Sequence, residues 1–557
     1  MIEKIYELSK IFCKNEETHE KLSEFSNREV GYFVVINLNN GIYEGLSSFK
    51  PTNLGKKLLF VGALGNLTTN PSPSINLQGS KNEKDDRKKL HDVLKKFMNF
   101  FKHEDTRKIH KILIGNYERI YEDLLKIPAK DRSRALLSIL IKENSEEFFP
   151  SERDDIKKVF LERQLTHKGE SHNTCFFCGR KISSYPQLNE VFKFATFDKP
   201  GFTPVISKKA YGVLSICDEC RADLKAARTF IENNLSYDFF GGDILWIIPS
   251  SPNPNYLKKI IDKLRDIFSK EQMRRFSETE RIIEKRLSEG ESVGYDFAVL
   301  SISKNEEKIL MHATDVSPAR LSKIIREADR VMEEFGENYN PTLRNLYEIF
   351  KPPKSRGAGK KQFYELVKSM YEDKEFSKET FLFYSMRWAR NNISSSDSNT
   401  LVPRMIRTGR MLFSFYVYLA RINVFKGGKY MENGGFFERY SEFFDKEWKK
   451  AVFLTGVLAG YLIGYQSEER GSVPFVKKLK GLKMRKEDVE GLLPEIKAKT
   501  LQYKIEDEKL EKIFSSVSQY FLKAGSWQAS VDEINFVFTV GMSMYTKFFR
   551  RDEDEKE

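Results

Sequence analysis

Four of the five cysteines in this chain form two C-x-x-C pairs, Cys175 with Cys178 and Cys217 with Cys220. Two residues between the thiolates of a pair let both sulfurs bind one cation, and two such pairs complete a tetrahedral shell. Matched pairs are more typical of a metal site than of buried or redox-active cysteines. The sequence therefore predicts a Zn²⁺ site made by these four residues. Because four thiolates leave no position for water, we expect the zinc to be structural.

The segment between the two pairs, Gly179 to Ile216, is longer than in a compact zinc ribbon. Its composition predicts short strands and turns at Phe192–Ala195 and Thr196–Phe202. We therefore expect the zinc to close a small, ribbon-like module. His167 and His172 lie just upstream in a polar stretch typical of a solvated linker, so we do not expect them to be ligands.

The charge balance suits a polyanionic partner. Lys and Arg number 93 against 80 Asp and Glu, which gives a formal net charge of +13. Because 31% of all residues are charged, this excess is mild and any basic surface must be local. The single remaining cysteine fits a reducing cytoplasm. The first residues have an amphipathic helix pattern, from which we expect no secretory signal.

An apolar run, Ala451–Tyr465, carries Gly456, Gly460 and Gly464 at intervals of four residues. Small residues at this spacing form close-packing seams in membrane helices. The run is shorter than the roughly 20 residues that a membrane span needs. It predicts instead a buried helix in a soluble bundle, packed closely against a neighbouring backbone, and no membrane contact.

Periodicity predicts an α+β chain. Strands and hairpins are expected at residues 31–38 with 42–46, 57–62, 244–249, and 296–302 with 308–312. Helices are expected over residues 85–141, from Asp218, in the charged segments before Arg286, and almost throughout beyond residue 361. The fold class is therefore a mixed N-terminal α/β region with an inserted zinc-ribbon-like module, followed by a C-terminal all-helical bundle.

Composition shifts suggest where domains begin and end. The expected parts are an N-terminal mixed α/β domain (1–160), a four-cysteine zinc module (161–235), an α+β region (236–350), a basic linker (351–361), a helical region with an arginine track (362–430) and a C-terminal helical bundle (431–557).

The basic linker is one candidate for nucleic-acid binding. It has five cations and no acid, with Pro and Gly that disfavour a helix, and the candidates are Lys354, Arg356, Lys360 and Lys361. Flexible cations can contact phosphates without reading bases. A solvated hinge explains the same composition equally well.

A second candidate lies on the aromatic helix that follows. Arg404, Arg407 and Arg410 recur at i, i+3 and i+6 on its polar side, without acids among them. This spacing places the three guanidinium groups on one face and predicts a phosphate track. Arg387 and Arg390 could extend the track.

The chain lacks the usual catalytic motifs: a phosphate-binding G-x-x-x-x-G-K-[ST] loop, a G-x-S-x-G elbow and an H-E-x-x-H helix. The Gly-Gly-Asp sequence ending at Asp243 is typical of metal-binding turns, but two-metal chemistry needs clustered carboxylates and Ile244 follows. We expect a turn before a buried strand and no enzyme. A palm-type nucleotidyl cyclase or nuclease that uses Asp243, and a standalone zinc-dependent DNA-binding regulator, remain the alternatives.

Further sequence features accompany the cysteine pairs along the chain. They are Asp315–Arg320, Phe436–Glu438, Ala451–Leu458, Gln466 and Leu492–Glu495. With these features the chain resembles the large subunit of type I-B CRISPR Cascade, a family with paired C-x-x-C motifs, over its full length.

The resemblance implies a non-catalytic role in prokaryotic antiviral defence. Such subunits join a guide RNA and other Cascade subunits in the cytoplasm. They recognise a short motif that flanks the target in double-stranded DNA, and they support R-loop formation, in which guide pairing supplies most of the specificity. A separate helicase-nuclease is then recruited to cut.

Two further expectations depend on this resemblance. Asn66, Thr68 and Asn70, in a loop shaped by Gly and Pro, are candidates for reading the flanking motif, with an ordinary surface loop as the alternative. Related large subunits carry a separately translated small subunit at their C-terminal end. Because two glycine codons can spell a ribosome-binding site before Met431, we expect residues 431–557 also to be made alone.

Overall fold

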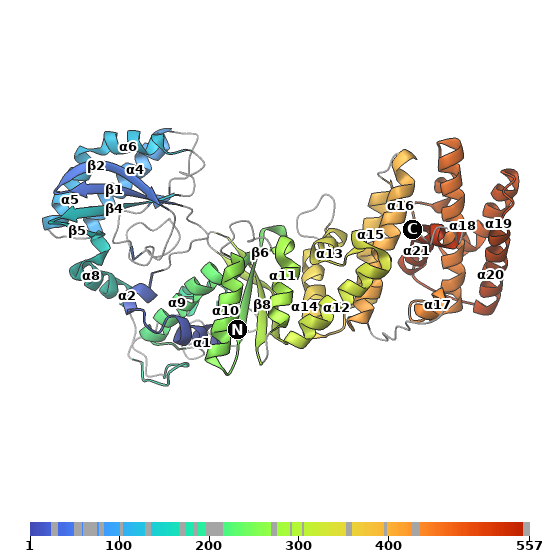
Figure 1. Ribbon diagram of the computed structural model, residues 1–557, viewed down its shortest axis with the longest axis horizontal. Coiled ribbons are helices and arrows are strands. Elements are labelled where there is room, and N and C mark those ends of the chain that lie inside the picture. The colour runs from blue at the N-terminus through green and yellow to red at the C-terminus, as the bar shows by residue number, and fades with distance from the viewer. Residues whose placement is uncertain are drawn as a thin grey trace, which may run out of the picture. The chain divides into compact units, whose positions relative to one another are not determined.

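The chain forms two compact units. The first contains Met1–Arg274 and Tyr295–Ile309, and the second contains Arg275–Gly294 and Leu310–Glu557. This computed structural model describes residues 1–23, 32–49, 58–59, 75–76, 83–100, 104–128, 135–165, 174–182, 188–195, 215–268, 276–289, 292–303, 306–351, 359–394, 398–425 and 435–549. Sheets in the N-terminal part and helices in the C-terminal part confirm the expected α+β fold class (Figure 1).

The first predicted hairpin is confirmed. Strands β1 (Tyr32–Asn39) and β2 (Ile42–Phe49) pair antiparallel. Between them Asn40 and Gly41 have φ angles of 45° and 79°. A two-residue turn with both φ values positive matches the twist of the strands, and Asn-Gly is the sequence that adopts it most readily.

The rest of this sheet corrects the predicted helix over residues 85–141. Helices α4 (Glu83–Phe100), α5 (Glu104–Gly115) and α6 (Tyr117–Lys126) agree with it, but β4 (Ala135–Glu143) is a strand. This strand lies parallel to β1 and also pairs with β3 (Ile75–Asn76) and β5 (Glu146–Phe148). Its apolar run suits a central strand with both faces covered.

Helices α4, α5 and α6 lie beside this sheet (Figure 1), and one core joins them to it. Its fully buried members include Val34, Ile36, Leu38, Leu90, Leu94, Leu113, Ile120, Leu137 and Ile139. The predicted strand over 57–62 is wrong where it is described, because Leu58 and Leu59 form a buried turn and Leu59 has φ 49°. Its remaining residues lie outside the described part of the chain.

A second sheet has the strand order β6-β7-β8-β9. Its strands are β6 (Ser236–Asp238), β7 (Ile244–Ser250), β8 (Gly294–Ile302) and β9 (Glu307–Val316), which confirms the strands predicted from residue 244 onward. The helices in this part of the chain are α1 (Ile2–Phe12), α2 (Thr18–Lys21), α8 (Asp154–Leu165), α9 (Asp218–Asn234) and α10 (Pro254–Phe268), with short 3-10 turns η2 (Pro150–Glu152), η3 (Leu188–Glu190) and η6 (Phe240–Gly242).

The predicted strand at Phe192–Ala195 is wrong. The backbone N–H of Phe192 bonds to the carbonyl of Leu188 at 2.9 Å, and that of Ala195 bonds to the carbonyl of Phe192 at 2.9 Å. These are the short-range bonds of successive turns rather than of a strand ladder. The strand predicted at Thr196–Phe202 lies outside the described residues.

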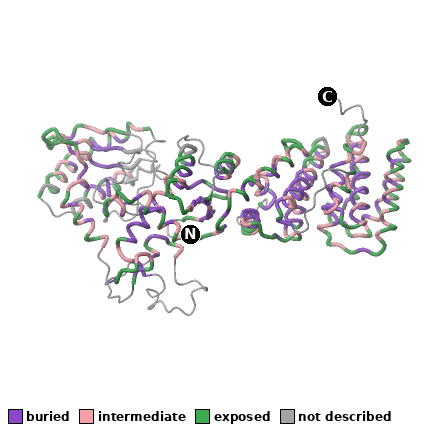
Figure 2. Tube along the Cα trace, turned by 60° about the horizontal axis from the view of Figure 1, so that its bottom comes forward, coloured by how far each residue is buried: buried purple, intermediate pink, exposed green. Residues whose placement is uncertain are grey.

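The second unit is almost entirely helical where it is described, as predicted. Its helices are α11 (Phe276–Ser288), α12 (Pro318–Phe335), η7 (Glu337–Tyr339), α13 (Leu343–Phe350), α14 (Lys360–Glu372), α15 (Lys378–Ser394), α16 (Ser398–Arg421), α17 (Phe436–Arg439), α18 (Glu447–Arg470), η8 (Pro474–Leu479), α19 (Lys486–Gln502), α20 (Glu508–Ala524) and α21 (Val531–Phe549). In Figure 2 the buried residues run along the inner sides of these helices. The predicted linker ends early, because Lys360 and Lys361 already belong to α14.

The three glycines of the apolar run lie against α21, which confirms the predicted close packing. A Cβ atom on Gly456 would lie 2.3 Å from the carbonyl oxygen of Phe538, and one on Gly460 would lie 2.3 Å from that of Met542. On α21 itself, a Cβ on Gly541 would lie 2.0 Å from the carbonyl oxygen of Phe453 in α18. We call this contact between α18 and α21 the glycine seam. The helix α18 is thus a buried bundle helix, and no helix in the described part of the chain has the length and hydropathy to cross a membrane.

We expect Gly456→Ala to destabilise the protein by about 1–3 kcal/mol, because the added methyl group meets backbone that cannot move aside. Gly491→Ala on α19 is the matched control, since nothing lies within 4 Å of its new Cβ. The control should gain about 0.5–1 kcal/mol from helix propensity. The midpoints of denaturant unfolding measure the stability change in both variants. Equal shifts in the two would contradict the close packing of Gly456 against α21.

Candidate metal centre and nucleic-acid interface

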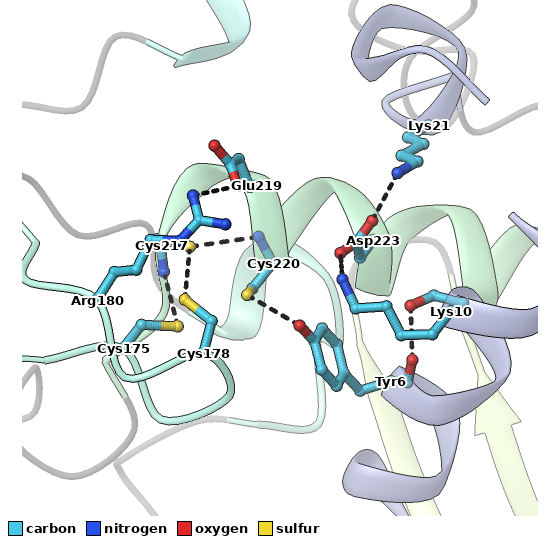
Figure 3. A network of polar contacts seen from close by, with 11 residues as sticks. Tyr6, Lys10, Lys21, Cys175, Cys178, Arg180, Cys217, Glu219, Cys220 and Asp223 are labelled. Atoms are coloured by element: carbon cyan, nitrogen blue, oxygen red, sulfur yellow. Dashed lines mark hydrogen bonds and ion pairs between the residues drawn. The ribbon is translucent and has the colours of Figure 1, made fainter. Parts of the chain in front are cut away.

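The four cysteines come from two local structures that meet at one point (Figure 3). The first pair lies in a tight turn closed by a bridge between Thr174 and Lys181, where Gly179 adopts φ 70°. In the second pair, Cys217 is the N-cap of α9 and Cys220 lies in its first turn. A turn and a helix N-terminus therefore supply two thiols each.

The geometry fits a tetrahedral ion. All four Sγ atoms lie within 4.8 Å of one another, and those of Cys178 and Cys217 are 3.7 Å apart. With a Zn–S bond of about 2.3 Å, a tetrahedral shell separates its sulfurs by about 3.8 Å. The four predicted ligands therefore lie close enough together to hold one metal ion, and zinc bound there would be structural.

Hydrogen bonds prepare these sulfurs for a cation. The backbone N–H of Cys217 points at Cys175 Sγ (3.4 Å), and that of Cys220 points at Cys217 Sγ (3.5 Å). Hydrogen bonding from the Cys220 side chain, opposed by burial, lowers the pKa of Cys217 to about 5. Within the same cluster, hydrogen bonding to Cys217 together with burial raises the pKa of Cys220. The cluster thus disfavours ionisation of all four thiols at once, and a bound cation would offset this cost.

Helix α1 completes the surroundings of the site. The hydroxyl of Tyr6 lies 3.3 Å from Cys220 Sγ, and the Tyr6 ring packs against Phe177 with centroids 4.5 Å apart. One turn farther along α9, Asp223 forms ion pairs with Lys10 and, at 2.9 Å, with Lys21 (Figure 3). The N-terminal helices are therefore tied to the same helix that carries two of the ligands.

We expect the purified chain to contain about one zinc ion, and Cys217→Ser to remove most of it and to lower the melting temperature. Cys13→Ala is the matched control because Cys13 is buried but lies outside the cluster. Metal analysis and thermal unfolding check the result. Full zinc content in Cys217→Ser would contradict the assignment.

Asp243 lies in the expected turn before a buried strand. Gly241 and Gly242 have φ angles of 68° and 79°, and the Asp243 side chain is buried at the start of β7. Three or more Cys, His, Asp or Glu side chains could hold a metal ion if their ligand atoms lie close together. Among the described residues, the four cysteines are the one group that does so. The described part of the chain therefore places no cluster of carboxylates around Asp243.

The predicted arginine track has exposed and buried parts. Arg404 and Arg407 are exposed on α16, whereas Arg410 is half-buried and donates to Thr546 Oγ1 at 2.6 Å. Arg387 donates to the carbonyl of Phe350 at 3.1 Å. Arg390 donates to the carbonyl of Leu482 at 3.0 Å and pairs with Asp532 at 2.5 Å. Arg404 and Arg407 are thus the members best placed to meet a ligand.

Of the linker candidates, Lys361 is exposed and lies 3.8 Å from Glu365, and Lys360 is half-buried. Several predicted positions lie outside the described residues: Lys354, Arg356, Asn66, Thr68, Asn70, His167, His172 and Met431.

The Asp315–Arg320 motif forms a structural joint in the second unit. Ser317 caps α12 by accepting a bond from the backbone N–H of Arg320 at 3.2 Å. The buried guanidinium of Arg320 donates to the carbonyl of Met370 at 2.6 Å and pairs with Asp373 at 2.5 Å. The motif therefore fixes the start of α12 to the end of α14.

A buried acid pair in the second unit was not found from the sequence. Glu280 and Glu284 lie on one face of α11. The two carboxylate oxygens of Glu280 accept bonds from the backbone N–H of Leu343 at 3.0 and 3.1 Å. Glu284 accepts a bond from the Tyr371 hydroxyl at 3.1 Å. Burial raises the pKa of Glu284 to about 7, and burial together with the Glu284 charge raises that of Glu280. The sequence signal, two acids four residues apart, is identical to that of a solvated helix face.

This pair should make the stability of the protein depend on pH. An acid whose pKa is raised in the native state binds an extra proton there, so its contribution is complete below about pH 4.5 and is lost as the pH rises through about 7. We expect the free energy of unfolding to fall by up to about 1.4 kcal/mol per pH unit in this window. Glu284→Gln should flatten the profile, whereas the exposed Glu333→Gln should not. Parallel profiles in all three proteins would contradict the assignment.

Comparison with protein families identifies the chain. Residues 172–316 match the central domain of CRISPR-associated protein TM1802, and residues 341–556 match its C-terminal domain. The chain is a CRISPR-associated protein of the TM1802 family. The central domain contains all four cysteines, and the C-terminal domain contains the exposed arginines and the glycine seam. No curated protein matches the chain.

Proposed function

We propose that this CRISPR-associated protein is the non-catalytic large subunit of a guide-RNA-directed DNA-surveillance complex of type I-B. The observation that carries the proposal is a pair of exposed arginines within a CRISPR-associated domain. Among the described residues, no acid lies within ion-pair distance of Arg404 or Arg407. Exposed cations without acidic partners suit phosphate contacts, which supply affinity without reading sequence.

In this proposal the guide RNA supplies specificity and the protein supplies shape and charge. Pairing of guide and target replaces DNA pairing at nearly balanced cost, so protein contacts to the backbone can decide whether the duplex opens. The exposed arginines would hold a phosphate backbone during that exchange. Recognition of the flanking motif is assigned to the loop with Asn66, Thr68 and Asn70. Unchanged motif discrimination in the triple alanine variant would contradict that assignment.

Recruitment of a helicase-nuclease and separate production of residues 431–557 belong to the same proposal. In the full chain, α16 covers α21 so closely that a Cβ on Gly409 would lie 2.4 Å from that of Ser543. A small subunit that begins at Met431 would lack α16 and would expose this face of α21. Other copies or subunits would then have to cover it.

Purification of the tagged chain from its host tests the proposal. We expect a short guide RNA and other complex subunits to accompany it, together with a small band whose N-terminal sequence begins at Met431. Metal-dependent turnover that Asp243→Ala abolishes, or sequence-specific duplex binding without RNA, would overturn the proposal in favour of an enzyme or a standalone regulator.

The exposed arginines give a sharper test in the assembled complex. Arg404→Gln with Arg407→Gln should weaken target-DNA binding about tenfold or more and reduce the slope of log K against log salt by about 2. Lys509→Gln with Lys512→Gln on α20 is the charge-matched control, since both lysines are exposed in the same helical unit. Equal weakening in the two variants would contradict a specific track.

A further inference from the structure

The segment that connects α18 to α19 contains an unusual concentration of positive charge. Between Gly471 and Lys486 the chain has six Lys or Arg residues and no acid. The six are Lys477, Lys478, Lys480, Lys483, Arg485 and Lys486. We call Gly471–Lys486 the basic connector.

The backbone of the basic connector is held in an uncommon conformation. Lys480, Gly481 and Leu482 adopt consecutive φ angles of 47°, 61° and 60°. Left-handed conformations of residues other than Gly cost of order 1–3 kcal/mol each and persist where the surroundings impose them. Such a segment is specified by its neighbours rather than by its own preference.

Two side chains from neighbouring helices impose this conformation. Asn535, fully buried on α21, accepts a bond from the backbone N–H of Met484 at 3.1 Å and donates to its carbonyl at 2.8 Å. Arg390 donates to the carbonyl of Leu482, whose own side chain is buried. The backbone that carries the cations is therefore fixed, and the side chains extend from a defined position.

Only half of the cations have an acidic partner among the described residues. Lys478 lies 3.2 Å from Glu495, Lys480 lies 2.5 Å from Asp488 and Lys486 lies 3.8 Å from Glu490. Lys477, Lys483 and Arg485 are exposed, and no acid in the described part of the chain lies within ion-pair distance of them. On the neighbouring α20, Lys512 is paired with Glu508.

We propose that the basic connector is a sequence-independent binding site for the phosphodiester backbone of a nucleic acid, and that Lys477, Lys483 and Arg485 make the contacts. A lysine ammonium is a point charge with rotatable donors, which suits contact with phosphates and not bidentate reading of bases. A fixed backbone whose three exposed cations have no acid within ion-pair distance among the described residues can replace the counterions condensed on a nucleic acid without reorganising. The inference rests on the proposed function for its biological ligand.

This site is separate from the arginines on α16, although Arg390, a candidate extension of the arginine track, contacts it. Arg410 contacts Thr546 near the end of α21, whereas the basic connector is held by Asn535 near its start. Eleven residues of helix separate the two contacts, or about 16 Å at 1.5 Å per residue. A strand held by both sites would follow the length of the bundle.

Salt-dependent binding to the zinc-loaded full chain tests the inference, with fluorescent oligo-dT and a mixed-sequence duplex as the probes. Replacing Lys477, Lys483 and Arg485 with Gln removes three charges. For a single strand the slope of log K against log salt should fall by about 2, and binding at 0.1 M salt should weaken by up to about 100-fold. Lys509, Lys512 and Lys523, replaced together with Gln on α20, are the matched control and remove the same charge from exposed positions.

Each outcome decides the inference. Weaker binding in the connector variant but not in the control supports the site. Loss of oligo-dT binding alone indicates a single-stranded ligand, and loss of binding to both probes indicates a site that accepts either form. Unchanged slopes, or equal losses in both variants, overturn it. Unchanged melting temperatures confirm that both variants fold. If the connector variant still binds DNA normally and still carries guide RNA, this site is refuted but the proposed function is not. If the unmodified chain carries no guide RNA, the proposed function is refuted but this site is not.

Discussion

Four sulfurs that could share one metal ion join two separate parts of the first unit. Their mutual distances of at most 4.8 Å bring a turn near residue 178 to the N-terminus of α9. Helix α9 in turn holds α1 through Tyr6 beside Cys220, and holds both N-terminal helices through Asp223. These contacts all start from α9, so one helix positions both the cysteine cluster and the two N-terminal helices. A metal ion held by all four thiolates would stabilise this arrangement and would have no open position for a reactant.

The second unit uses polar groups in the same way, to position elements. Arg320, Glu280 and Asn535 each satisfy backbone groups of another segment from a buried position. A buried polar group is costly unless it is bonded, so each of them specifies one arrangement of its neighbours. Of the exposed cations, Lys483 and Arg485 flank Met484, whose backbone Asn535 holds.

Features that depend on local spacing could be predicted from the sequence. The turn at Asn40 and Gly41, the two cysteine pairs and the seam of Gly456 and Gly460 depend on residues a few positions apart. The strand at Ala135–Glu143 could not be predicted, because an apolar run fits a buried helix and a central strand equally until the parallel partner is known.

The same limit applies to charge. Glu280 and Glu284 have the spacing of a solvated helix face, and only long-range packing buries them. Arg390 looked available in the sequence, yet its partners are 92 and 142 residues away. Among the described residues, Lys477, Lys483 and Arg485 have no acid within ion-pair distance, whereas the neighbouring Lys478 and Lys480 do. The role of a cation is therefore decided by its tertiary neighbours.

The glycine seam has a mechanical consequence. With backbone atoms of α18 and α21 in direct contact at Gly456, Gly460 and Gly541, neither helix can rotate or slide without driving a side chain into the other's main chain. Packed interiors of this density resist deformation and transmit displacement. The two helices are therefore expected to move together as one rigid body.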